Sequence, residues 1–181
     1  TIISPSTKKA IAEFAARYPN STHVMYDTQS ASGLLQANGG VVPGYDFSKA
    51  SVIVSLGADF LGTWISPVEY ARQYAATRKI NSDNRRMSRH FQFETALSLT
   101  GSNADVRVPI KPSEMGATAL ALYNAVVNGS GVDTKTKLGL AAAELKAAGS
   151  TGLVVSGSND PAVQSLVTAI NQALGNGSTT T

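Results

Sequence analysis

The chain has 181 residues, of which 43% are apolar and 15% are charged, and its formal net charge is +3. This composition excludes intrinsic disorder, which requires low apolar content and high net charge, and so small a charge gives no argument for nucleic acid as a partner. The chain contains no cysteine. Disulfides, cysteine-ligated zinc, thiol catalysis and iron–sulfur ligation by these residues are therefore excluded.

The two ends suggest a piece of a longer protein. The chain begins at Thr1, and residues 175–181 are Gly, Asn, Ser and Thr only. We expect one domain over residues 1–175 and a flexible tail over residues 176–181; a mature protein after signal removal is the alternative. No apolar run approaches the roughly 20 residues that a bilayer-spanning helix needs, so no membrane span is expected.

Helix-like and strand-like patterns alternate along the chain. Ser4-Pro5 is typical of a helix start, and the apolar residues that follow it share one face. These residues are Ile11, Phe14, Ala15 and Tyr18. The later elements are expected as strands over 22–26, 51–56, 91–93, 105–110 and 153–155, and helices over 29–37, 66–79, 113–128, 134–148 and 160–174.

The order of these elements predicts the fold class. Strands separated by helices of about 10–15 residues are typical of βαβ units and a mainly parallel sheet. Right-handed crossovers then place helices on both faces of the sheet. We therefore expect a three-layer α/β/α sandwich with a Rossmann-like sheet, in which Pro109 and Pro112 confine the strand over 105–110 to an edge.

The strand, loop and helix over residues 51–79 form the strongest candidate for a binding site. The loop over 57–64 follows the carboxyl end of a strand, where open α/β sheets bind ligands, and the next helix start could hold an anion. Gly57 and Gly62 would let the backbone approach a ligand. The alternative is that Phe60, Leu61 and Trp64 pack the loop down or contact another domain.

A basic stretch lies within twelve residues and comprises Arg78, Lys79, Arg85, Arg86 and Arg89. Such a stretch would contact phosphate, anionic lipid or an acidic protein surface. It has no interleaved aromatic residues for base stacking, so nucleic acid is not expected. The alternative is a solvated loop.

Acid–base candidates are few. His23 and His90 are the only histidines; each adjoins an expected strand, and a structural or surface position rather than a catalytic role is expected for both. Glu94 follows the strand over 91–93, where α/β nucleotide sites often direct a carboxylate at a ribose; a solvated acid is the alternative. No phosphate loop, Gly-x-Gly-x-x-Gly run or Gly-x-Ser-x-Gly elbow occurs.

Several segments together resemble a known family. They are residues 45–50, 52–64, 66–72, 104–112 and 170–175, of which Gly-Ala-Asp-Phe-Leu-Gly-Thr-Trp at 57–64 is the most specific. The chain resembles the nucleotide-binding α/β portion of molybdopterin-dependent oxidoreductases. It is most similar to the molybdopterin oxidoreductase-like domain of the hydrogenase-type iron–sulfur subunit of bacterial alternative complex III, a quinol:cytochrome c oxidoreductase.

The chain departs from the cofactor-binding enzymes at two places. Those enzymes usually carry Asp-Pro-Arg where this chain has Glu94-Thr95-Ala96, and alanine cannot offer phosphate the donors of arginine. They often carry an amide where this chain has Asp59, and a carboxylate repels a diphosphate. Both departures fit the alternative complex III subunit, whose molybdopterin-like domain is understood to lack the cofactor.

The resemblance implies a vestigial site and a structural role. The candidate residues of that site are Gly57, Asp59, Glu94, Ser98 and Thr100. No catalytic residue, metal ligand or cofactor is expected in this chain, and iron–sulfur clusters are expected elsewhere in the parent subunit. The domain would scaffold that subunit in a membrane-bound quinol-oxidising complex on the periplasmic side, after Tat-type export.

The expected partners are other domains and subunits of the complex, with candidate contact surfaces at Arg85-Arg86 and at the loop from Phe60 to Trp64. Two alternatives stay open. One is the part of a working molybdopterin (guanine dinucleotide) oxidoreductase that holds the nucleotide end near Gly57, Glu94 and Ser98. The other is a free-standing α/β module that binds a small ligand.

Overall fold

The computed structural model describes residues 4–24, 26, 29–80, 82, 85–130, 133–177 and 179–181. The chain divides into two compact units, Thr1–Ser30 and Ala31–Thr181. This division differs from the expectation of one domain over 1–175. Among the described residues, both hydrophobic cores are built from side chains of the second unit.

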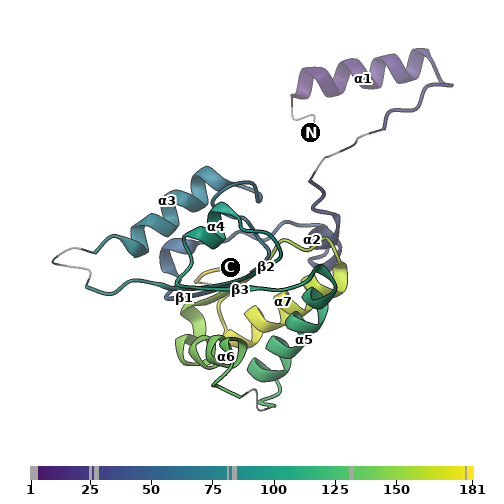
Figure 1. The fold of residues 1–181 in the computed structure, drawn as a ribbon. Coiled ribbons are helices and arrows are strands. Elements are labelled where there is room, and N and C mark those ends of the chain that lie inside the picture. The colour runs from purple at the N-terminus through teal and green to yellow at the C-terminus, as the bar shows by residue number, and fades with distance from the viewer. Residues whose placement is uncertain are drawn as a thin grey trace. The chain divides into compact units, whose positions relative to one another are not determined.

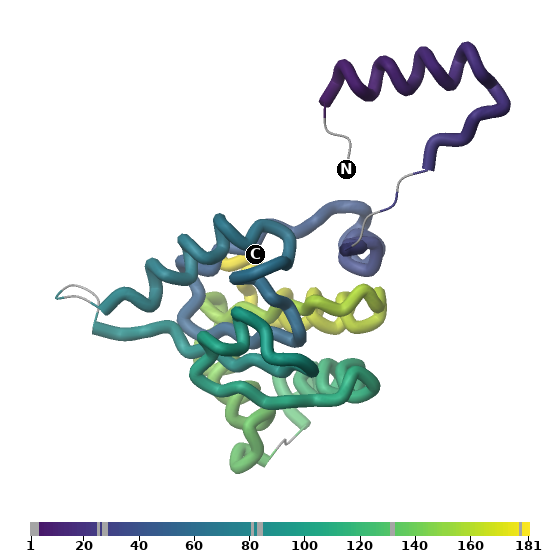
Figure 2. Tube along the Cα trace, turned by 45° about the horizontal axis from the view of Figure 1, so that its top comes forward, coloured from purple at the N-terminus to yellow at the C-terminus, as the bar shows by residue number. Residues whose placement is uncertain are grey.

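The first unit contains helix α1 (Pro5–Arg17), whose backbone is traced in Figure 2. The expected helix start is confirmed, because the Ser4 side chain accepts a hydrogen bond from Thr7 N and proline opens the first turn. The expected inward face is wrong: no residue of α1 is buried, and Phe14 is 57% exposed. Residues 22–24 form no strand, and Met25, also within the strand expected over 22–26, lies outside the described residues.

The second unit is built on a parallel sheet in the order β3-β2-β1-β4, with α3 above it and α5, α6 and α7 below it in Figure 1. Every neighbouring pair of strands is parallel. The strands are β1 (Val52–Leu56), β2 (Arg89–Glu94), β3 (Val106–Pro109) and β4 (Gly152–Ser156). The predicted fold class, a Rossmann-like α/β fold, is confirmed, and β3 is an edge strand as expected.

Helices cover both faces of this sheet. The α-helices are α2 (Ser32–Ala37), α3 (Pro67–Arg78), α4 (Leu99–Ser102), α5 (Met115–Val126), α6 (Lys137–Ala148) and α7 (Pro161–Leu174). The described residues also form the short 3-10 helices η1 (Phe47–Lys49), η2 (Pro112–Glu114) and η3 (Gly149–Thr151). Residues of α5, α6 and α7 pack on one face, and residues of α3 and η1 on the other.

Two hydrophobic cores follow from the alternation of side chains along β1. Val54 and Leu56 point into the core beneath α5, α6 and α7. Ile53, the residue before Val54, points to the opposite face and into the aromatic core beneath α3. All three side chains are fully buried, and each such burial stabilises the fold by roughly 1.5–3 kcal/mol.

The outer edge of β4 is closed by side chains. Asn171 on α7 bridges one residue of that edge, because Val154 N donates to its Oδ1 at 3.0 Å and its Nδ2 donates to Val154 O at 2.8 Å. Asn176 Nδ2 and Thr180 Oγ1 both donate to Gly152 O, at 2.8 and 3.0 Å. In parallel pairing these alternate residues direct their backbone groups away from the neighbouring strand.

The expected flexible tail over 176–181 is wrong for its described residues. Asn176 and Thr180 are buried. Thr180 O also accepts a hydrogen bond from Asp46 N at 3.0 Å. The polar side chains of Asn176 and Thr180 bind the backbone of β4.

Within the described residues, no helix is both long enough and apolar enough to cross a membrane.

Candidate functional site

The candidate residues lie together at the carboxyl ends of β1 and β2. Gly57 directly follows β1, with φ at 71°, and its N–H donates to Phe93 O at 2.8 Å. Glu94 is the last residue of β2, and the loop after it leads into the short helix α4. The chain passes from β1 to β2 and β3 on one side and to β4 on the other, so the topological switch point lies between the carboxyl ends of β1 and β4, beside Gly57 and one strand away from Glu94.

Glu94 accepts four hydrogen bonds. Its Oε1 accepts from Ser98 N at 3.2 Å and from Arg107 Nε in an ion pair, and its Oε2 accepts from Ser98 Oγ at 2.6 Å and Gln92 Nε2 at 3.1 Å. Burial by itself raises the pKa of Glu94, but the hydrogen bonds from Ser98 and Arg107 outweigh it and hold the pKa below its usual value. A carboxylate has about four lone-pair sites, so all of them are occupied by this chain.

Asp59 ties the loop after β1 to α4. Its Oδ1 accepts from Thr100 N at 3.0 Å and Thr100 Oγ1 at 2.8 Å, and its Oδ2 accepts from Thr63 Oγ1 at 3.3 Å. Thr100 Oγ1 in turn accepts from Leu61 N at 2.9 Å. Both carboxylates of the candidate site therefore bind the protein's own loops.

Two glycines make room for these carboxylates. A Cβ atom on Gly62 would collide with Asp59 Oδ2, and a Cβ atom on Gly101 would collide with Glu94 Oε1. We expected Gly62 to bring the backbone close to a ligand. In the structure, the Asp59 carboxylate occupies the space that a side chain at position 62 would fill.

The hydrogen-bond network of the site continues into the protein through Gln92, His90 and Tyr74, which the sequence did not single out for this site. Gln92 and His90 share one face of β2 with Glu94, since alternate residues of a strand point the same way. His90 Nε2 lies 3.2 Å from Gln92 Oε1, and His90 Nδ1 lies 3.1 Å from the Tyr74 hydroxyl. His90 is fully buried, and desolvation lowers its pKa to about 4.

The loop from Phe60 to Trp64 packs largely inward. Phe60 is fully buried and stacks on Phe47, with ring centroids 4.3 Å apart. Its expected role in an outer contact surface is therefore wrong. Trp64 is half-buried, and its ring centroid lies 5.2 Å from that of Tyr45.

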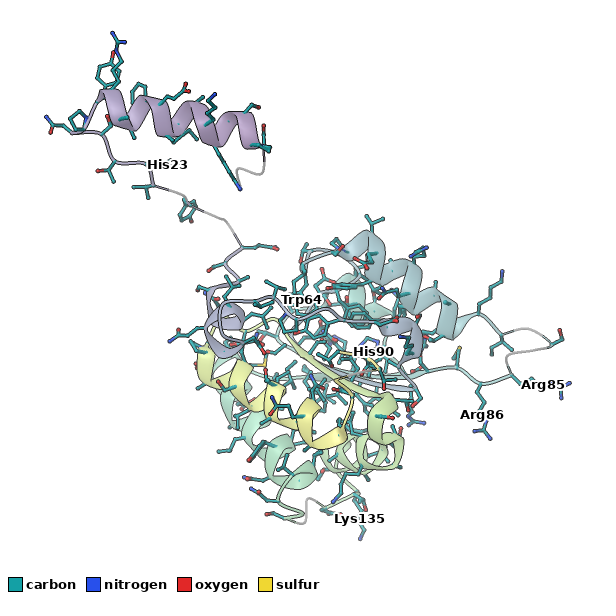
Figure 3. All side chains as sticks on the ribbon, turned by 180° about the vertical axis from the view of Figure 1, so that it is seen from behind. His23, Trp64, Arg85, Arg86, His90 and Lys135 are labelled. Carbon is teal, nitrogen blue, oxygen red and sulfur yellow. The ribbon has the colours of Figure 1, made fainter. Side chains whose placement is uncertain are left out.

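Two arginines of the basic stretch form ion pairs that bind it to the fold. Arg78 forms a bidentate ion pair with Asp105, at 2.7 and 2.8 Å, and Arg89 pairs with Glu144 at 3.2 Å. Arg85 and Arg86 are exposed, as Figure 3 shows. Three residues of the loop expected there, Asn81, Asp83 and Asn84, lie outside the described residues.

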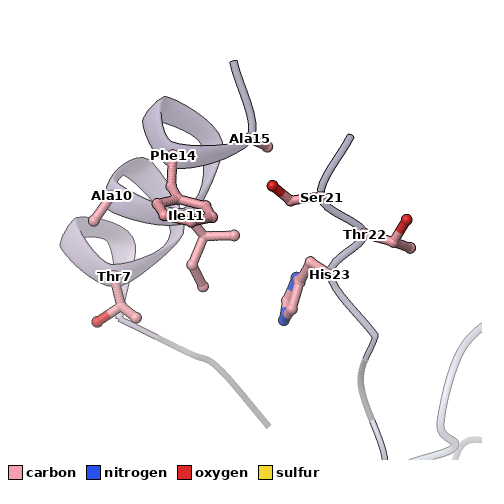
Figure 4. Close-up of a pocket in the computed structure, with 8 residues that line it drawn as sticks. All are labelled: Thr7, Ala10, Ile11, Phe14, Ala15, Ser21, Thr22 and His23. Atoms are coloured by element: carbon pink, nitrogen blue, oxygen red, sulfur yellow. The ribbon is translucent and has the colours of Figure 1, made fainter. Parts of the chain in front are cut away.

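A separate apolar cavity of about 460 Å³ lies within the first unit. Figure 4 shows Ile11 and Phe14 of α1 facing Ser21, Thr22 and His23 across it. The cavity contains none of the residues expected to form the vestigial site.

Metal ligands and known relatives give no further assignment. Within the part of the chain that the structure describes, no three or more His, Asp or Glu side chains group as a metal site would require. No family model matches the chain, and no curated protein matches it significantly. Chemically, the site is an internal hydrogen-bond network in which the side chains of Asp59 and Glu94 hold two loops in place.

Proposed function

We propose that the chain is a non-catalytic, cofactor-less α/β domain that scaffolds the iron–sulfur subunit of a membrane-bound, quinol-oxidising respiratory complex. The observation that carries the non-catalytic part is the saturation of Glu94 by Ser98, Gln92 and Arg107. A ribose or phosphate placed there would have to displace one of these groups. The sequence resemblance to the alternative complex III subunit supplies the rest of the proposal.

The proposal places the domain on the periplasmic side, in contact with other domains and subunits of the complex. Exposed Arg85 and Arg86 are the candidate contact residues that the fold leaves at the surface. Charges of this kind direct association with an acidic protein surface. Redox chemistry would belong to cysteine-bound clusters outside these 181 residues.

Guanine nucleotide binding tests the proposal against a working molybdopterin enzyme. Isothermal titration of the chain with GDP is expected to show no saturable heat. Glu94→Ala removes the carboxylate at the strand end, and Glu69→Ala serves as its control because Glu69 is an exposed acid on α3. Saturable binding that persists in Glu69→Ala and disappears in Glu94→Ala would refute the scaffold role.

The reading frame around this sequence tests the assignment to an iron–sulfur subunit. A parent subunit of that kind is expected to carry runs such as Cys-x-x-Cys-x-x-Cys-x-x-x-Cys, because four thiolates hold each cubane cluster. A parent frame with no such run would contradict the assignment and favour a free-standing ligand-binding module.

A further inference from the structure

A polar cavity of about 450 Å³ is formed by residues of α3, of the segment around η1 and of the C-terminal end of the chain. A hydrogen bond from Asp46 N to Thr180 O, at 3.0 Å, joins the last two of these walls. The volume is in the range of small-molecule sites. None of the described residues that line the cavity belongs to the network of Asp59 and Glu94, so the two sites are separate.

Two buried tyrosines of this cavity have hydroxyl groups without a partner in the protein. Tyr45 is 7% exposed and Tyr70 is 4% exposed, and their rings meet edge to face with centroids 6.4 Å apart. Among the described residues neither phenolic oxygen makes a hydrogen bond, yet the only fully enclosed side-chain polar atom without a partner is Gln164 Oε1. The two phenolic oxygens therefore reach the open space of the cavity. Buried tyrosine hydroxyls usually have a hydrogen-bond partner, so this pair indicates a ligand.

The electrostatic field in the cavity opposes negative charge. Burial raises the pKa of Tyr45 above its ordinary value, and a charge on Tyr70 would raise it further. Burial and the nearby Glu69 carboxylate raise the pKa of Tyr70 to about 12. Both phenols are therefore neutral at physiological pH. A field that disfavours a phenolate favours a cation at the same place.

Glu69 supplies a carboxylate that is held in position by its neighbours. Ser66 Oγ donates to its Oε2 at 3.1 Å, and Gln73 Nε2 donates to its Oε1 at 3.2 Å. Gln73 is itself fixed, because its Oε1 accepts from Phe47 N at 3.1 Å. A carboxylate has about four lone-pair sites, so Glu69 can still accept from a ligand. Among the described residues no basic side chain forms an ion pair with it.

The other two charged side chains of the cavity compensate each other. Lys49 Nζ lies 3.3 Å from Asp46 Oδ2, and the backbone and hydroxyl groups of Ser48 donate to Asp46 Oδ1. Lys49 is thus paired with Asp46. The Glu69 carboxylate then leaves the described lining of the cavity with one uncompensated negative charge.

We propose that this cavity binds the ammonium group of a small organic amine. An ammonium has three N–H donors and no acceptor. One N–H donates to Glu69 and the others to the phenolic oxygens of Tyr45 and Tyr70, so every donor has an acceptor and the charge has a counter-charge. A neutral polyol would leave the charge of Glu69 uncompensated, and an anion would be repelled by it. This site is independent of the proposed scaffold function.

Isothermal titration of the full chain with 1,5-diaminopentane tests the proposal. The matched neutral probe is 1,5-pentanediol, which has the same length and carries hydroxyl groups in place of the ammonium groups. At physiological ionic strength the diamine is expected to bind saturably at one site, and the diol is expected to give no saturable heat. Equal binding of the two probes would assign the cavity to polyols and overturn the proposal, as would the absence of diamine binding.

Tyrosine variants locate the bound amine. Tyr45→Phe and Tyr70→Phe each remove a hydroxyl that no described residue binds, so the melting temperature should be unchanged. The affinity for the diamine should fall about tenfold in each, because a hydrogen bond to a charged group is lost. Tyr123→Phe on α5, outside the cavity, is the matched control and should leave the affinity unchanged. Undiminished affinity in the variant that lacks both hydroxyls would overturn the proposal.

A charge variant tests the role of the carboxylate. Glu69→Gln keeps the shape of the side chain and oxygen Oε1 as an acceptor but removes the charge, and it should weaken diamine binding about tenfold or more. Glu114→Gln, at an exposed acid of η2 outside the cavity, controls for the change in net charge. Equal weakening by the two substitutions would show a general charge effect and contradict the site. Circular dichroism during heating checks that every variant is folded.

Discussion

Gly101 has no side chain, and this leaves space for the Glu94 carboxylate to keep its hydrogen bonds with Ser98, Gln92 and Arg107. We expect Gly101→Ala to lower the free energy of unfolding by about 2–4 kcal/mol, because the new Cβ would displace Glu94 from Ser98 and leave a charge partly unpaired. Urea unfolding measures the change. Gly116→Ala is the control, since its Cβ meets no atom within 4 Å, and it should leave the stability unchanged or slightly raised. Equal effects of the two substitutions would contradict this explanation.

His90 makes the stability of the fold depend on pH. Its pKa falls from 6.5 to about 4 on folding, so between these values the unfolded chain binds more protons and stability decreases as the pH falls. The slope attributable to His90 is about 1.4 kcal/mol per pH unit. The lowered pKa values of Glu94 and Asp105 add a loss of the same sign at lower pH.

Urea unfolding at several values between pH 7 and pH 4 tests this dependence. His90→Gln is expected to lower stability at pH 7 and to flatten the slope above pH 4, because the titrating group is gone. An unchanged slope in this variant would show that His90 does not cause the pH dependence.

The sequence indicated part of the site and missed the part that depends on strand pairing. Asp59 and Thr100 lie in the segments that follow β1 and β2, and Glu94 is the last residue of β2, so their meeting at one end of the sheet could be anticipated. Arg107 is brought to Glu94 only by the register of β2 and β3, in which Gln92 pairs with Arg107. That register is not visible in a single sequence. The alternation of polar side chains at His90, Gln92 and Glu94 was the available signal for the buried network.

At the scale of an element, Asn171 replaces a neighbouring strand. We expect Asn171→Leu to lower the free energy of unfolding by about 2–4 kcal/mol, because it leaves Val154 N and O unpaired in a buried environment. The opened edge of β4 should also promote self-association, which size-exclusion chromatography detects. Gln172→Leu on the exposed side of α7 is the control. Association in Gln172→Leu but not in Asn171→Leu would contradict this role.

Elements with strong local signals were predicted well from the sequence. Helix α7 begins where Asp160 caps Ala162 N and ends at Gly175 in the left-handed conformation, and both signals are local. The expected strand over 22–26 shows the limit of such signals. A β-branched, aromatic run favours a strand only if another strand pairs with it, and residues 22–24 have none.

At the scale of the whole molecule, the stability of the second unit should not depend on residues 1–30. Within the described residues, both cores are built from residues after Ser30, and α1 buries no residue. A chain of residues 31–181 should therefore melt within about 4 °C of the full chain, a shift that corresponds to about 1 kcal/mol at this size. Circular dichroism during heating measures the melting temperature.

Removal of residues 176–181 is the matching truncation, and the opposite result is expected. It deletes the buried Asn176 and Thr180 and the hydrogen bonds that they make to Gly152 O and Asp46 N. Each buried backbone group left without a partner costs about 1–3 kcal/mol. The six-residue deletion should therefore destabilise the sheet more than the thirty-residue deletion, because stability follows burial rather than the number of residues removed. A greater loss from removing residues 1–30 would mean that the first unit supports the sheet after all.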